Sequence, residues 1–189
     1  MGDFKVRKVR DAEDRRRMFQ YALRDIEAFE HMLREGLITS EAPSIGAEQE
    51  LCIVDKLGNP ATRALDILDN VEDDHFTNEL ALFNLEINLD PLKLKGDCFS
   101  AMEKDLIQRM NRAYKVASEH DADIVMAGIL PTLKFRHLQF EYMTPIERYQ
   151  TLSQTLYDMR GAKFEIYLQG VDELIMSLGS VLFEACNTS

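Results

Sequence analysis

The stretch Ser44–Val54, SIGAEQELCIV, places two glutamates two residues apart inside an otherwise apolar run. In a β-strand successive side chains point to opposite faces, so Glu48 and Glu50 are predicted to project from the same face. Two like charges on one face repel each other, and a carboxylate buried without a partner is costly. A cation between the two carboxylates would relieve both costs. The stretch therefore predicts a strand that carries a candidate cation site.

A second run, Thr77–Asp90, adds two more glutamates among leucine, isoleucine and phenylalanine: TNELALFNLEINLD. Glu79 lies seven residues before Glu86, so a bend or a change of strand is needed to bring both carboxylates to one cavity. We expect two short strands here, or one strand that runs into a bend near Asn84. Alternation around Glu86 predicts one polar face, formed by Asn84, Glu86 and Asn88, and one apolar face, formed by Leu85, Ile87 and Leu89.

These carboxylates are the oxygen ligands that hard divalent cations such as Mg²⁺ and Mn²⁺ prefer. Enzymes that transfer phosphoryl groups use such cations to bridge nucleotide oxygens and to neutralise developing charge. The pattern predicts a metal site formed by Glu48, Glu50, Glu79 and Glu86. The alternative is a sheet with one face in solvent, on which glutamates are ordinary. The pattern alone leaves both interpretations open.

Length, charge and cysteine content argue against several classes of protein. A chain of 189 residues fits one domain or part of a larger one, and its net charge of −11 argues against nucleic acid or an anionic membrane surface as partner. No apolar run approaches the roughly 20 residues of a membrane helix. The three cysteines lack metal-type spacing, which indicates reduced thiols in a cytoplasmic protein. P-loop, GxGxxG and nucleophile-elbow motifs are absent from the sequence.

The element order predicts an α+β protein with an antiparallel or mixed sheet backed by helices. Residues 1–43 form an N-terminal helical segment, with a charged helix over 11–35, and residues 44–189 form the second unit. Because the chain stops just after a strand pattern, we expect the front portion of a longer polypeptide and an edge at which copies could pair. The remaining predicted elements are a helix over 63–71, a helix over 100–120 with a capping box at its start, a strand over 123–129, a helix that begins at Thr144-Pro145 and ends near Gly161, and strands over 164–169 and 174–186.

The arrangement resembles the glutamate–cysteine ligase family, and in particular its second type, the bacterial carboxylate–amine ligases. GAEQEL at Gly46–Leu51 is similar to the G-x-E-x-E strand of that family. ELALFNLEIN at Glu79–Asn88 resembles a family stretch with two glutamates seven residues apart. A long helix and a strand ending in a glycine–proline turn at Gly128–Pro131 follow in the same order. The resemblance covers roughly residues 44–133.

This resemblance implies a glutamine-synthetase-like catalytic fold, of which residues 44–189 would be the N-terminal part. It implies that Glu48, Glu50, Glu79 and Glu86 bind Mg²⁺ or Mn²⁺ that carries ATP. The implied partners are ATP and small amino-acid substrates. A carboxylate, typically the γ-carboxylate of glutamate, would become an acyl phosphate, and an amine, typically that of cysteine, would displace phosphate, as in glutathione biosynthesis.

The sequence also departs from the family pattern. Asn88-Leu89 stands where the family often has a threonine after the E-I pair. Family members are longer, and their later ligands and basic nucleotide contacts lie beyond an equivalent of Ser189. The chain therefore resembles about the first half of such an enzyme and is expected to carry an incomplete site. The alternative is a non-catalytic metal- or nucleotide-binding or regulatory module with the same fold, in which the glutamates point to solvent or to separate places.

Overall fold

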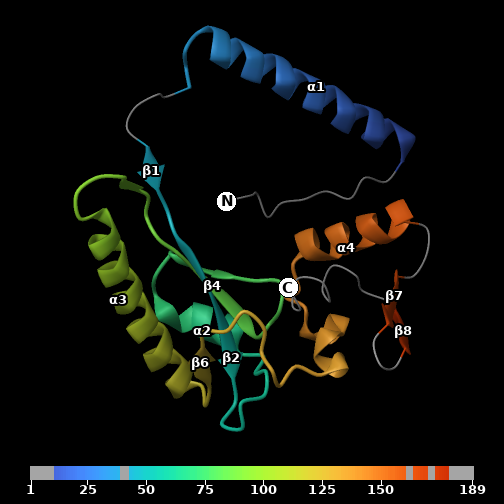
Figure 1. The fold of residues 1–189 in the computed structure, drawn as a ribbon. Coiled ribbons are helices and arrows are strands. Elements are labelled where there is room, and N and C mark those ends of the chain that lie inside the picture. Colours follow the sequence, from blue (N-terminus) through green and yellow to red (C-terminus); the bar gives the residue numbers. More distant parts are fainter. Residues whose placement is uncertain (1–10, 39–42, 161–163, 170–172, 179–189) are drawn as a thin grey trace.

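A four-stranded antiparallel sheet forms the centre of this α+β protein (Figure 1). The computed structural model describes residues 11–38, 43–160, 164–169 and 173–178. The strands of the sheet are β2 (Glu48–Val54), β3 (Phe76–Asn78), β4 (Asn84–Asn88) and β6 (Asp123–Val125). Their order in the sheet is β3-β4-β2-β6, so β2 and β4, which carry Glu50 and Glu86, are adjacent.

One face of the sheet is apolar and packs on two helices, α2 (Ala64–Val71) and α3 (Cys98–Glu119). The register pairs Leu51 with Leu85 and Gln49 with Ile87, so leucine and isoleucine fall on this face and the glutamates on the other. Full burial of each such side chain stabilises the fold by roughly 1.5–3 kcal/mol. The main buried side chains of this layer are Leu51, Ile53, Ile67, Leu85, Ile87, Met110, Ala113 and Ala117.

The opposite face is only partly covered. Around the end of β2 it packs on the segment that follows β6, which contains the short helices η1 (Phe135–Leu138) and η2 (Phe140–Tyr142) and the start of α4 (Glu147–Arg160). The second core formed there consists of Cys52, Val54, Leu80, Ala81, Phe83, Leu130 and Met143. At the start of β2, in contrast, Glu48 and Glu50 are exposed. This face of the sheet is therefore covered by the second core along the end of β2 and is exposed to solvent along the start of β2.

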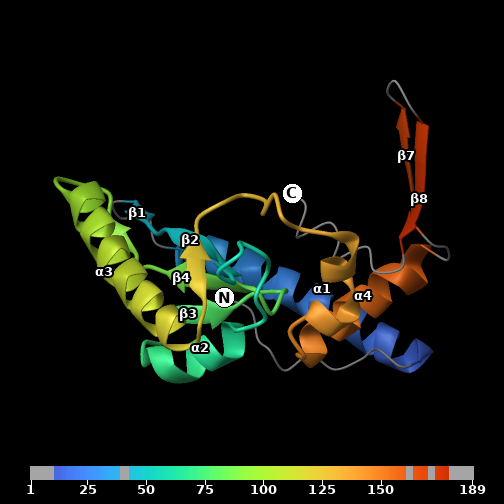
Figure 2. The same ribbon diagram turned by 90° about the horizontal axis from the view of Figure 1, so that it is seen from below.

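One helix and two pairs of strands lie around this body. The helix α1 (Ala12–Arg34) precedes it, and two very short strands, β1 (Ser44–Ile45) and β5 (Leu92–Lys93), pair beside the start of β2. After α4, strands β7 (Phe164–Gln169) and β8 (Glu173–Leu178) form an antiparallel hairpin, which extends away from the other elements (Figure 2). Among the residues described, no helix is both long enough and apolar enough to cross a membrane.

Most predicted elements are present, and the differences have local causes. The run Thr77–Asp90 contains two strands, as predicted. The helix expected over 100–120 begins at Cys98, and no side chain caps its start, so the predicted capping box is wrong. The strand expected over 123–129 ends at Val125, its last residue paired with β2. The part of the final predicted strand after Leu178 lies outside the described residues.

The helix expected to begin at Thr144-Pro145 begins at Glu147 instead. Thr144 is fully buried, and its hydroxyl donates a hydrogen bond to the backbone oxygen of Glu79 at 2.5 Å rather than capping the helix. Its backbone N–H donates to the carbonyl oxygen of Leu80 at 2.8 Å. Thr144 therefore joins α4 to the loop that carries Glu79.

Candidate metal centre

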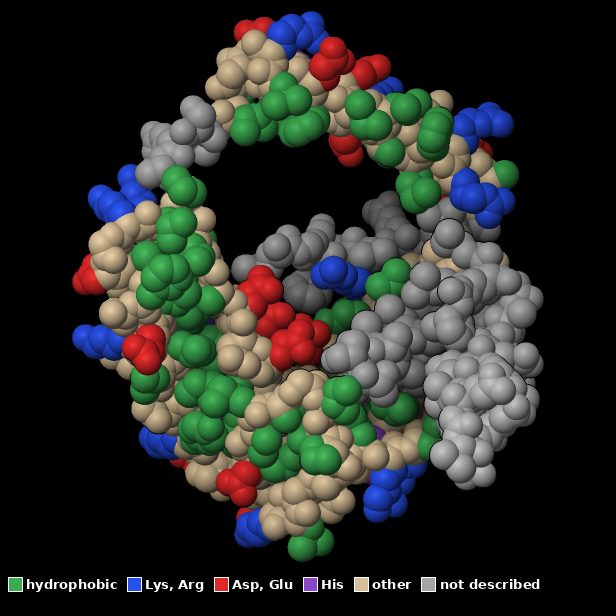
Figure 3. All heavy atoms as spheres, in the orientation of Figure 1, with side chains coloured by type: hydrophobic (Ala, Val, Ile, Leu, Met, Phe, Trp, Pro, Cys, Tyr) green, Lys and Arg blue, Asp and Glu red, His purple; other side chains and the backbone are tan. Residues whose placement is uncertain are grey.

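Three of the four predicted metal ligands meet on the open half of the sheet. One carboxylate oxygen each from Glu50, Glu79 and Glu86 lies within 4.8 Å of the others. Glu50 on β2 and Glu86 on β4 are directly opposite in the antiparallel register, and Glu79 comes from the loop between β3 and β4. Figure 3 shows a group of acidic side chains near the middle of the view, below the open space under α1.

The loop after Glu79 brings that carboxylate back over the strands. Leu80 and Phe83 are buried in the second core, and Ala81 forms a bridge with Met143. The backbone N–H of Leu82 donates to the carbonyl oxygen of Tyr142 at 2.8 Å. Because both polar and apolar contacts hold residues 80–83, Glu79 is fixed above Glu86 rather than free in solvent.

The close approach of the three carboxylates changes the protonation of Glu79. Burial, a hydrogen bond with Glu86 and the negative charges of Glu86 and Glu50 raise the pKa of Glu79 to about 7. The backbone N–H of Leu80 donates to Glu79 Oε2 at 3.2 Å and opposes this rise only in part. Without a cation, a proton on Glu79 therefore relieves the repulsion.

Two neutral side chains hold Glu86 in place. Asn88 Nδ2 donates to Glu86 Oε1 at 2.5 Å, and Thr77 Oγ1 donates to the same oxygen at 3.3 Å. Asn88 Nδ2 also donates to Thr77 Oγ1 at 3.2 Å, which closes a triangle across β3 and β4. Alternation along the sequence predicted Asn88 on this face. The position of Thr77 opposite Glu86 follows only from the pairing of β3 with β4.

Tyr149 on α4 is a second residue that sequence reasoning missed. Asn78 Nδ2 donates to its hydroxyl oxygen at 3.3 Å, at the end of β3 next to Glu79. Burial and the nearby charge of Glu79 raise the pKa of the tyrosine hydroxyl. The hydroxyl therefore stays protonated near neutral pH and can serve as a neutral donor beside the carboxylates. Its position 70 residues beyond Glu79 left no local signal in the sequence.

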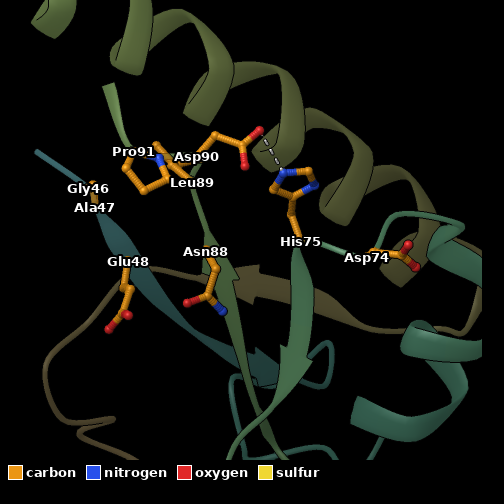
Figure 4. A pocket seen from close by; sticks show the side chains of 9 residues that line it. All are labelled: Gly46, Ala47, Glu48, Asp74, His75, Asn88, Leu89, Asp90 and Pro91. Atoms are coloured by element: carbon orange, nitrogen blue, oxygen red, sulfur yellow. Dashed lines mark hydrogen bonds and ion pairs between the residues drawn. The ribbon is translucent and has the colours of Figure 1, made fainter. Parts of the chain in front are cut away.

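Glu48, the fourth predicted ligand, is not in this group of three. It lies at the start of β2 opposite Asn88 and lines a separate hollow of about 640 Å³. In Figure 4 the side chains of Glu48 and Asn88 point the same way from neighbouring strands, whereas His75 lies toward Asp90. The structure thus places Glu48 beside the carboxylate group and at the border of the adjoining hollow.

His75 belongs to a charged network rather than to the carboxylate group. Its Nδ1 lies 2.9 Å from Asp73 Oδ1 and its Nε2 lies 3.2 Å from Asp90 Oδ2, and hydrogen bonds to both carboxylates raise its pKa. Asp73 also accepts hydrogen bonds from Arg109 of α3 at 2.6 and 2.7 Å. This network ties α3 to β3 and to the chain after β4.

The donor set determines which cation the group could hold. Three carboxylates without a thiolate or an imidazole favour hard cations such as Mg²⁺ or Mn²⁺. Oxygens bound to one such ion at about 2.0–2.2 Å lie no more than about 4.4 Å apart, so separations within 4.8 Å need only a small closing movement. Glu79 and Glu86 are partly buried, whereas Glu50 is exposed. The group is therefore open to water or substrate oxygens on the side of Glu50.

Comparison with known proteins returned one family. The family model described as glutamate-cysteine ligase family 2 (GCS2) matches residues 44–169. The matched region contains all four predicted ligands and the whole four-stranded sheet, and it begins after α1. No curated protein and no solved structure matched the chain.

Proposed function

This chain belongs to glutamate–cysteine ligase family 2, and we propose that it forms the metal-binding wall of an ATP- and Mg²⁺-dependent carboxylate–amine ligase. Family membership indicates a ligase. The observation that carries the finer proposal is the group of Glu50, Glu79 and Glu86, whose oxygens lie close enough together to share one hard cation. Within this proposal, residues 44–189 are the N-terminal part of a glutamine-synthetase-like catalytic domain and residues 1–43 are a helical segment before it.

The proposed reaction has two steps. A substrate carboxylate attacks the γ-phosphorus of ATP, which forms an acyl phosphate and releases ADP. An amine then attacks the acyl carbon, phosphate leaves with the bonding electrons, and the amine loses a proton to give the amide. Bound Mg²⁺ would neutralise charge on the transferring phosphoryl group.

The residues of this chain would contribute to that reaction by position and charge. Glu50 and Glu86 lie on paired strands, so their spacing is set by the sheet and not by a flexible loop. Thr77 and Asn88 orient Glu86, and the proton on Glu79 leaves when a cation arrives. Glu48 stands at the edge of the group, where it could bind a second cation or a cationic group of the substrate. Glutamate as the carboxylate substrate and cysteine as the amine are supported by the family resemblance.

The test is ADP release by the full-length protein with Mg-ATP, a panel of acidic amino acids and a panel of amines. We expect stimulation by one acid and one amine together, and a loss of at least about a hundredfold in Glu50→Gln and Glu86→Gln, in line with removal of one group that stabilises transferring charge. Glu103→Gln, on the exposed side of α3, is the matched control and should keep full activity.

The alternative is a non-catalytic metal- or nucleotide-binding module, and metal binding measured on the same variants separates the two. Binding of Mn²⁺ can be followed by its electron paramagnetic resonance signal, which weakens on binding. Mn²⁺ binding that depends on Glu86, together with no ADP release under any combination, would support the module. Wild-type protein that binds no Mn²⁺ would contradict both readings of the site.

A further inference from the structure

The helix α1 carries a continuous apolar side that buries nothing within the described part of the chain. None of its 23 residues is buried, and Arg24 and Glu27 are among the charges on its other side. Figure 3 shows apolar side chains along one side of α1, with open space between that side and the other elements drawn in colour. The main exposed apolar side chains are Met18, Phe19, Leu23, Ile26, Phe29 and Leu33.

Hydrogen bonds cap both ends of α1 and fix where the helix begins and ends. Asp11 accepts hydrogen bonds from the backbone N–H groups of Glu13 and Asp14 at 2.9 and 2.8 Å, which caps the start. Gly36 has a φ of +65°, and the N–H of Leu37 donates to the carbonyl oxygen of Met32, which closes the end. Most helical stability in proteins comes from packing of an apolar face, so a capped helix with such a face calls for a partner.

The apolar residues of α1 are spaced along the sequence as they are in helices that pair in a coiled coil. Phe19, Ala22, Ile26, Phe29 and Leu33 recur at alternating intervals of three and four residues, which is the heptad spacing of a coiled coil. This helix lies before the region that the family model matches, residues 44–169. A capped and heptad-spaced helix with an exposed apolar side indicates an association surface.

We propose that α1 pairs antiparallel with α1 of a second copy of this chain, an inference that does not rest on the proposed function. A two-fold axis near Arg24 places Phe19 opposite the second copy's Phe29 and Ala22 opposite its Ile26, so two aromatic rings meet in one pair and a small residue faces a large one in the other. The same axis places Arg16 opposite Glu30 at the flank. A parallel pair would instead bring the two Arg15–Arg17 clusters together.

The exposed area is sufficient for a dimer. The six large apolar side chains of this face are each about half exposed, and an exposed half of such a side chain offers on the order of 100 Å². Together they offer on the order of 600 Å² per partner, which is the lower end for a specific interface. The helix spans roughly 35 Å at 1.5 Å per residue, which is long enough to hold such a contact by itself.

The first test measures the molar mass of this 189-residue chain in solution by sedimentation equilibrium. We expect the wild type to have twice the 21.7 kDa of one chain, and Ile26→Glu to fall to 21.7 kDa. Ile107→Glu on α3 is the matched control, because Ile107 is 53% exposed against 63% for Ile26, and it should leave the dimer intact. A monomeric wild type, or a dimer that survives Ile26→Glu, would overturn the proposal.

The second test checks the antiparallel register. Arg16→Glu should weaken the dimer severalfold by placing two acidic groups together, and Arg16→Glu combined with Glu30→Arg in the same chain should restore it. Asp25 would lie near Asp25 of the second copy, so Asp25→Asn should tighten the dimer. Circular dichroism verifies that each variant keeps its helix. A double variant as weak as the single one would rule out this pairing.

Discussion

The pKa of Glu79 depends on the surroundings that the whole carboxylate group shares. Its pKa is raised to about 7 by burial and by Glu86 and Glu50, although a free glutamate has a value of 4.5. A residue that holds a proton at near-neutral pH because it is buried beside two other carboxylates is one that a divalent cation would deprotonate. Cation binding and proton release are therefore coupled at this residue.

This shift predicts how the metal-free protein responds to pH. Between about 4.5 and about 7 the folded state holds a proton on Glu79 that the unfolded state has lost, so the free energy of unfolding should fall as pH rises through this range. Urea unfolding in the presence of a chelator, repeated at several pH values, measures the slope. The difference between wild type and Glu79→Gln isolates this residue, and Glu103→Gln should follow the wild type. Equal slopes in wild type and Glu79→Gln would contradict the raised pKa.

Asn88 and Thr77 predict a second effect at the residue scale. Because both donate to Glu86 Oε1, Asn88→Ala should weaken Mn²⁺ binding by about 10- to 100-fold, the usual cost of losing a partner of a metal ligand. Thr77→Val, which keeps the shape but removes the donor, should act in the same direction with a smaller effect. Mn²⁺ titration followed by electron paramagnetic resonance gives both affinities.

A matched control for these two variants is Asn70→Ala on α2. Asn70 donates only to the backbone oxygen of Asp66 in its own helix and lies on the exposed side. Its Mn²⁺ affinity should equal that of the wild type. If Asn88→Ala binds Mn²⁺ as tightly as this control does, the triangle around Glu86 does not orient a ligand.

At the scale of elements, the attachment of α3 to the sheet depends on charge as well as on apolar packing. Asp73 accepts from Arg109 at 2.6 and 2.7 Å and from the backbone N–H of His75 at 3.1 Å. Although partial burial alone would raise the pKa of Asp73, the hydrogen bonds from His75 and Arg109 lower it overall. These contacts fix β3, and thereby Thr77, against α3.

Removal of this carboxylate should destabilise the protein. The Asp73 and Arg109 side chains are mostly buried, and loss of one member of such a pair leaves an uncompensated charge, so Asp73→Asn should lower the free energy of unfolding by about 3 kcal/mol. Asp66→Asn removes the exposed pair with Arg63 and should change it by less than about 1 kcal/mol. Denaturant unfolding at neutral pH compares the two. Equal losses would show that the network adds nothing to the attachment of α3.

At the scale of the whole molecule, the second core and the carboxylate group share one face of the sheet. The dry half of that face holds the loop of Glu79 through Thr144 and Tyr142, and the open half presents Glu50 and Glu86. A cation that bridges the loop and both strands would connect the two halves. It would bind the folded protein and not the unfolded chain, so it should stabilise the fold as a whole.

We expect the thermal midpoint of unfolding to rise when Mg²⁺ or Mn²⁺ is added, and to rise further as the concentration of the ion increases. At a hundred times the dissociation constant the added stability is about 2.7 kcal/mol. Glu86→Gln should lose this dependence, whereas Glu103→Gln should keep it. A rise of equal size in Glu86→Gln would assign the effect to ions bound elsewhere.

Local patterns in the sequence predicted much of the fold. Alternation alone sorted Glu86 and Asn88 from Leu85 and Ile87, because side-chain direction in a strand depends only on neighbouring residues. The α+β class and the family were also correctly predicted. Helix starts were less predictable: Thr144 has the local signature of an N-cap, but a distant contact with Glu79 uses its hydroxyl.

The sequence by itself determined which faces of the strands carry carboxylates and which family the chain resembles, since both depend on residues close together along the chain. Only the tertiary structure decided which carboxylates meet. The register of β2 on β4 sets Glu50 against Glu86, the anchored loop returns Glu79 to them, and Glu48 is left at the edge of the group. Strand register and loop anchoring arise from contacts between residues far apart in sequence, so no local pattern could specify them.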